Sequence, residues 1–82
     1  MRISIFTPKQ TIWQGRARQA VLPCEDGQIC VLDFHQPFLV SLSKGDIRYI
    51  AQEKNVILNK QISIKDGVAR MRRNELSILI ET

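Results

Sequence analysis

The chain has 82 residues, of which 44% are hydrophobic and 24% charged, and a formal net charge of +4. This hydrophobic fraction excludes a disordered chain, and the length predicts a single domain over residues 1–82. No apolar run approaches the roughly 18 residues needed to cross a bilayer. The net positive charge is compatible with binding to nucleic acid or to an acidic partner and does not decide between them.

Apolar and polar residues alternate in short segments along nearly the whole chain, which is typical of strands. In chain order the segments are 2–6, 15–23, 37–45, 46–51, 55–59, 61–65, 68–73 and 75–81. Turn signals separate them, including the Asp-Gly pairs at 26–27 and 66–67. No segment predicts a helix longer than one turn. The pattern predicts an all-β fold: a small sandwich of two antiparallel sheets with about eight to ten short strands.

The sequence gives little support for an enzyme. His35 is the only histidine, and a triad would have to pair it with Ser41 or Cys30. The chain lacks a Gly-x-Ser-x-Gly elbow, and its four glycines are isolated, so no phosphate-binding loop is present. Asp33 is the one neighbour that could join His35 on a metal, and two ligands do not make a site. We expect no catalytic residue, metal or cofactor, and an imidazole that hydrogen-bonds the backbone of its own loop.

The two cysteines, Cys24 and Cys30, fit no common zinc pattern. A disulfide across a hairpin is the alternative in an oxidising compartment. The N-terminal stretch MRISIFTP has no apolar signal-peptide region. We therefore expect two reduced cysteines that serve as small apolar residues.

Arg70, Arg72 and Arg73 form the one basic cluster in the sequence. Nucleic-acid readers of this size pair basic stripes with exposed aromatic rings, so a small basic β-barrel that binds nucleic acid is an alternative function. Most of the five aromatic residues occupy positions that read as core. We interpret the cluster as solvated charges on an edge strand, which prevent edge-to-edge aggregation.

Several short motifs follow one another in a distinctive order. Phe6-Thr7-Pro8 ends the first predicted strand and Glu25-Asp26-Gly27 forms an acidic turn. Next come His35-Gln36-Pro37-Phe38-Leu39 and Gly45-Asp46-Ile47-Arg48. Over the whole chain this order resembles the N-terminal β-sandwich of the epsilon subunit of F-type ATP synthases, with its acidic turn, its Pro-Gly-His-Ala-Pro-Leu-Leu loop and its Gly-x-Ile-Arg strand.

Two departures fall in the histidine loop, where Asp33 and Phe34 replace the Pro-Gly of the family pattern. We expect a different loop geometry here, because phenylalanine adopts the positive φ of a glycine only at a cost. The chain also stops at Thr82, straight after the last predicted strand. The resemblance therefore implies either a minimal coupling subunit without the inhibitory helical domain or a fragment.

The resemblance implies a non-catalytic rotor subunit of the central stalk, which couples ion translocation through the c-ring to ATP synthesis. Its partners would be the gamma subunit and the polar loops of the c-ring, with indirect contact to the catalytic head and no nucleic acid or cofactor. It would lie at the cytoplasmic face of the inner (plasma) membrane as a peripheral part of the complex.

The resemblance also implies which residues meet these partners. In the family the acidic turn and the histidine loop lie at the end of the sandwich that faces the ring. The c-ring candidates are therefore Gln28, His35 and Asp33. The candidates for the gamma contact are Leu39, Ser41, Lys44 and Ile47.

Overall fold

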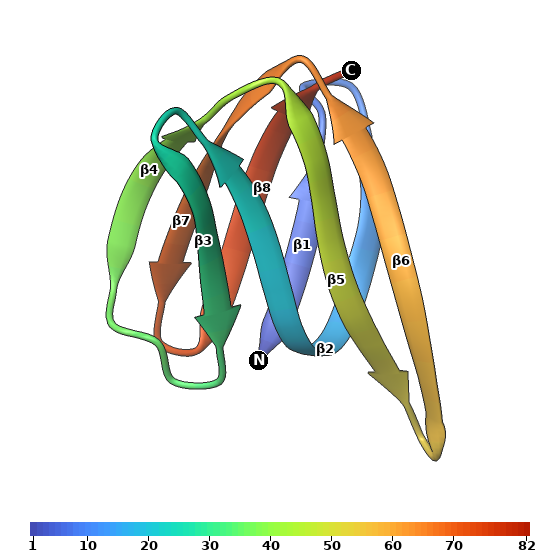
Figure 1. Ribbon diagram of the computed structural model, residues 1–82. Coiled ribbons are helices and arrows are strands. Elements are labelled where there is room, and N and C mark those ends of the chain that lie inside the picture. The colour runs from blue at the N-terminus through green and yellow to red at the C-terminus, as the bar shows by residue number, and fades with distance from the viewer.

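A computed structural model describes residues 1–82 as eight strands without a helix (Figure 1). No helix suited to crossing a membrane is therefore present. The strands are β1 (Arg2–Phe6), β2 (Thr11–Cys24), β3 (Gly27–Leu32), β4 (Phe38–Leu42), β5 (Gly45–Glu53), β6 (Val56–Ile64), β7 (Asp66–Arg72) and β8 (Glu75–Glu81).

The strands form two layers that share one strand, β2. Sheet A has the order β4, β7, β8, β1 and the first part of β2, and sheet B has the order β3, the second part of β2, β5 and β6. Residues Thr11–Arg16 of β2 pair with β1, whereas Ala17–Cys24 pair with β3 and β5. A register shift between Ala17 and Gln19 accompanies the change of partner. In Figure 1, β2 curves from the rear layer into the front layer at this point.

The predicted all-β sandwich is confirmed, although the predicted segments omit β3, divide β6 at Lys60 and begin β2 four residues late. One strand pair also differs in direction. β1 and β8 run parallel to each other, so that sheet A is mixed, while the other strand pairs are antiparallel. A parallel pair needs a connection much longer than a hairpin. Here β2 to β7 supply that connection, which local alternation in the sequence does not reveal.

The core lies between the two layers and is built from the inward residues of both sheets. Its largest fully buried side chains are Ile3, Ile5, Leu22, Val31, Ile47, Met71, Leu76, Ile78 and Ile80. Burying one such side chain contributes about 1.5–3 kcal/mol. No polar or charged residue is buried. The alternate residues of each strand therefore form outward faces that packing leaves free.

The sandwich has two distinct ends, separated by the length of the strands. At one end, which we call the N-terminal end, Met1 meets the bend of β2 and the β7–β8 turn: Ala17 N donates to Met1 O at 2.9 Å, and Arg2 N to Asn74 O at 3.1 Å. At the other, the C-terminal end, Ser43 N donates to Pro23 O at 3.0 Å. Figure 1 places the C-terminus and the β2–β3 turn at this second end.

We expect Gly67→Ala to destabilise sheet A. A Cβ at Gly67 would lie 2.6 Å from the carbonyl oxygen of Leu79 on the neighbouring strand, and this backbone atom cannot give way cheaply. The free energy of unfolding should fall by about 1–3 kcal/mol, as for other overpacked sites. Urea unfolding measures the loss, with Ser77→Ala on β8 as the control. An unchanged unfolding midpoint for Gly67→Ala would contradict the packing of β7 on β8.

Candidate partner interface

His35 lies in the exposed loop between β3 and β4, at the N-terminal end. Its Nδ1 is hydrogen-bonded to the carbonyl oxygen of Gln36 at 2.9 Å, and its ring packs edge-on against Phe38 with 5.3 Å between ring centroids. The imidazole thus bonds the backbone of its own loop, as the sequence predicts. These contacts position the ring as part of the loop surface.

Phe34 adopts a left-handed backbone conformation, with φ 61°. Phe34 thus takes a positive φ, the conformation that we expected a phenylalanine to adopt only at a cost. Two hydrogen bonds hold it there: Phe34 N donates to Asn74 Oδ1 at 2.8 Å, and His35 N donates to Leu32 O at 3.2 Å. The first bond joins the loop to the β7–β8 turn, and this hydrogen bond offsets the conformational energy cost of the positive φ at Phe34.

Phe34→Gly should stabilise the protein. A left-handed non-glycine residue costs roughly 1–2 kcal/mol, and the greater freedom of glycine in the unfolded chain returns part of this. Phe34 is 82% exposed, so that little packing is lost. We expect a net gain of roughly 0.5–1 kcal/mol in the free energy of unfolding. Gln36→Gly, in the same loop, should lower that free energy instead. A loss of stability for Phe34→Gly would contradict this account.

Both cysteines are free in the structure. Cys24 is the register partner of Gly27, and Cys30 is the partner of Val21, so the two thiols are not opposite each other in the β2–β3 hairpin. Cys24 packs against the core, and its partial burial raises the pKa of its thiol. Cys30 is exposed.

The two thiols should therefore react at different rates. A raised pKa leaves less of the Cys24 thiolate at any given pH, and the thiolate is the reactive species. During treatment with iodoacetamide at pH 8, Cys30 should be alkylated first, and mass spectrometry of the digested protein follows both sites. In denaturing urea the two rates should converge. Equal rates in the folded protein would contradict the assigned burial of Cys24.

The residues expected to face the c-ring do not lie together. Gln28 lies beside the β2–β3 turn at the C-terminal end, whereas Asp33 and His35 follow the far end of β3. A strand rises about 3.3 Å per residue, so the length of β3 separates them. The expectation that the acidic turn and the histidine loop share one end is therefore wrong. Asp33 forms an ion pair with the N-terminal ammonium of Met1 at the N-terminal end.

Three of the four expected gamma contacts are exposed. Leu39 and Ser41 point outward from β4, and Lys44 lies in the connection to β5. Ile47 is fully buried, with 0% exposure, because it belongs to the inward face of β5 that also carries Tyr49. Ile47 has no surface to offer a partner, so its assignment to an interface is wrong.

Leu39 and Ser41 belong to a larger surface, the outer face of sheet A, which cross-strand pairing arranges in rows. In the first row, Ser41 is paired with Val68, Val68 with Leu79, and Leu79 with Phe6. In the second row, Leu39 is paired with Arg70, Arg70 with Ser77, Ser77 with Ser4 and Ser4 with Gln14. Paired residues share a face and lie within about 5.5 Å of each other at Cβ.

Four of the nine exposed large hydrophobic side chains of the protein lie on this face. Leu39 is 70% exposed, Val68 42%, Ile12 40% and Leu79 38%. The end of the face nearest the C-terminus is hollowed, with Ile12, Val68 and Leu79 among its lining residues. The exposure of Ile12, Val68 and Leu79 was not predicted from the sequence. Their alternation with buried neighbours was the available signal, but it does not say which face of a strand is covered.

The arginine cluster is not on an edge strand. Arg70 and Arg72 lie on β7, which pairs with β4 on one side and β8 on the other, so the edge-strand interpretation is wrong. The sheet also brings in two arginines that are distant in sequence. Arg72 is paired with Glu75, Glu75 with Arg2, and Arg2 with Arg16, which makes a third row on the outer face of sheet A.

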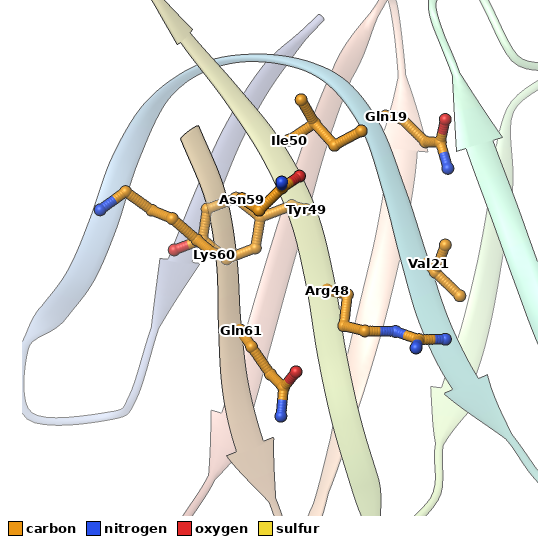
Figure 2. Close-up of a pocket in the computed structure, with 8 residues that line it drawn as sticks. All are labelled: Gln19, Val21, Arg48, Tyr49, Ile50, Asn59, Lys60 and Gln61. Atoms are coloured by element: carbon orange, nitrogen blue, oxygen red, sulfur yellow. The ribbon is translucent and has the colours of Figure 1, made fainter. Parts of the chain in front are cut away.

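The outer face of sheet B is different in character. A shallow depression of 400 Å³ is lined by Gln19, Val21, Arg48, Tyr49, Ile50, Asn59, Lys60 and Gln61 (Figure 2). Figure 2 shows the side chains of Arg48, Lys60 and Gln61 pointing in different directions. They do not converge on one point. Tyr49 instead packs against Trp13, with 4.8 Å between ring centroids, and burial raises the pKa of its hydroxyl.

The geometry thus defines a small two-layer β protein whose notable surface is an apolar and basic sheet face, which is suited to contact with a macromolecule. The model of the family described as ATP synthase, Delta/Epsilon chain, beta-sandwich domain matches residues 1–82. The chain belongs to this family. The family match does not favour the nucleic-acid alternative.

Related sequences carry the same description. The ATP synthase epsilon chain of Synechococcus sp. (strain PCC 6716) is 30% identical over 80 residues, which are 98% of this chain and 55% of that protein. The ATP synthase epsilon chain of Thermosynechococcus vestitus has the same identity and coverage. The chain therefore spans about half the length of the curated relatives it matches.

Solved structures share the fold. One chain in the Tetrahymena thermophila mitochondrial ATP synthase, central stalk and c-ring, matches with a TM-score of 0.80 at 15% identity, over 100% of this chain and 63% of that chain. One chain in the Euglena gracilis mitochondrial ATP synthase matches with a TM-score of 0.84 at 17% identity, over 98% of this chain and 49% of that chain.

Proposed function

We propose that residues 1–82 form one domain that acts as a non-catalytic rotor subunit in the central stalk of an F-type ATP synthase. It binds the gamma subunit and the c-ring, and so couples ion translocation to ATP synthesis, while the chemistry of ATP belongs to other subunits. Membership of the delta/epsilon β-sandwich family supports this role. As part of that complex, the protein sits peripherally at the cytoplasmic face of the inner (plasma) membrane.

The outer face of sheet A is the proposed contact for gamma, and its exposed apolar side chains are the observation that carries the proposal. Leu39, which is 70% exposed, projects from β4 at the edge of this face, with Ser41 beside it on the same strand. Val68 and Leu79 extend the apolar surface across β7 and β8. Contiguous exposed apolar surface on a small protein marks an interaction site.

The C-terminal end is the proposed contact for the ring. Gln28 is exposed there, beside the β2–β3 turn. Lys44, a candidate for the gamma contact, lies in an exposed connection at the same end, next to the hydrogen bond that joins Ser43 to Pro23. Asp33 is engaged with the Met1 ammonium at the opposite end, and His35 bonds its own loop there. Of the three ring candidates, Gln28 is the one whose position suits a contact at this end.

Replacing Leu39 by aspartate tests the gamma contact. The side chain is already exposed, so that the fold should survive, while a carboxylate in an apolar contact should weaken binding about tenfold. The measurement is rebinding of the chain to ATP synthase membranes from which it has been stripped. Ile57→Asp, at a position 51% exposed on β6 of the other sheet, is the matched control. Equal affinity for the two variants would contradict the assigned face, and failure of the unaltered chain to rebind would contradict the proposed function.

A further inference from the structure

We propose that the partner covering the outer face of sheet A presents carboxylates opposite its arginines, beside an apolar strip that meets Leu39, Val68 and Leu79. The inference rests on the proposed function and gives its protein contact a definite chemistry: an acidic protein surface docked on a basic sheet face. The arginine row defined by Arg72, Glu75, Arg2 and Arg16 carries the argument.

The row crosses four adjacent strands. Its four members come from β7, β8, β1 and β2 and are joined by direct register pairs, all four being exposed. Neighbours in such a row lie about 5 Å apart at Cβ. Arg70 stands one row away on β7, and Arg73 lies in the turn after it. A hollow of 250 Å³ is lined by Arg70, Arg72, Arg73, Glu75 and Ser77.

These charges are not neutralised within the molecule. The one ion pair in the structure joins Met1 to Asp33, and no arginine takes part in it. Glu75 is the single acidic residue in the row and stands between Arg72 and Arg2. Arg2 and Arg16 face each other directly across β1 and β2, and like charges in that position destabilise a sheet. A contact that supplies carboxylates would offset this cost.

Protection of a sheet edge does not explain the row, because β7, β8 and β1 each have a neighbour on both sides. The residues between the arginine row and the apolar row do not suit nucleic acid either. They are Leu39, Ser77, Ser4 and Gln14 beside Arg70, and none offers a ring for base stacking. Phe6 is only partly exposed in the far row, and the exposed ring of Phe34 belongs to the β3–β4 loop and not to this sheet face. Guanidinium groups next to an exposed aliphatic strip fit a protein surface, because the guanidinium fork binds carboxylates with two hydrogen bonds.

Charge reversal at matched positions tests the inference. Arg72→Glu and Arg16→Glu alter the row on two different strands, whereas Arg48→Glu makes the same change on the outer face of sheet B. Each full chain is rebound to stripped ATP synthase membranes at low and at high salt, after thermal unfolding has established that it folds. Both row variants should bind at least about fivefold more weakly than Arg48→Glu at low salt, and this difference should shrink at high salt as the charges are screened. Arg72→Lys, which keeps the charge, should lose less than Arg72→Glu.

The outcomes separate the inference from the function on which it rests. If the unaltered chain rebinds and the row variants match Arg48→Glu, the acidic-partner inference is overturned while the stalk role stands. If the unaltered chain does not rebind, the proposed function fails. If it instead binds a DNA or RNA duplex, and the row variants abolish that binding, the arginines serve nucleic acid and the inference is likewise overturned.

Discussion

The rest of the structure depends on β2 pairing with both sheets. Its first part pairs with β1 and its second part pairs with β3 and β5, so a single continuous strand joins the two layers. A domain of this size buries only about 60% of the surface that its unfolded chain exposes, so its stability depends on both layers packing on one shared core. The bend at Ala17 also brings Met1 against the strand, through hydrogen bonds in both directions. The pairing of β2 with both sheets therefore sets the outer faces of sheets A and B and the two ends of the sandwich.

Alternation along the strands gives the two sides of sheet A different roles. Inward residues such as Ile3 and Ile78 fill the core, and outward residues on the same strands build the rows of apolar and basic side chains. Because the inward side supplies the stability, the outward side can keep exposed aliphatic groups and adjacent arginines that packing would not select. A stiff sandwich with such a face suits a part that must transmit torque by contact. The proposed stalk role needs no reactive group of its own.

The sequence predicted most of the strands, because alternation is local and turn residues mark where each strand ends, but it missed β3 and divided β6 into two segments. It did not predict which strands are neighbours. The meeting of Arg2 with Glu75 depends on the parallel pairing of β1 and β8, and the placing of Gln28 and His35 at opposite ends depends on the direction of β3. Ile47 was assigned to an interface by resemblance, although its alternation with Tyr49 matches the buried pattern that the fold adopts. The positive φ of Phe34 rests on a distant asparagine that no local pattern indicates.

Side-chain footprinting within the assembled complex tests the central claim most directly. ATP synthase purified with this chain bound, and the free chain, would be oxidised by hydroxyl radicals and compared residue by residue with mass spectrometry. The account predicts that Leu39, Val68 and Leu79 are protected in the complex, while Ile57 on the other sheet reacts as in the free chain. Protection of Ile57 with unchanged oxidation of Leu39, Val68 and Leu79 would contradict it.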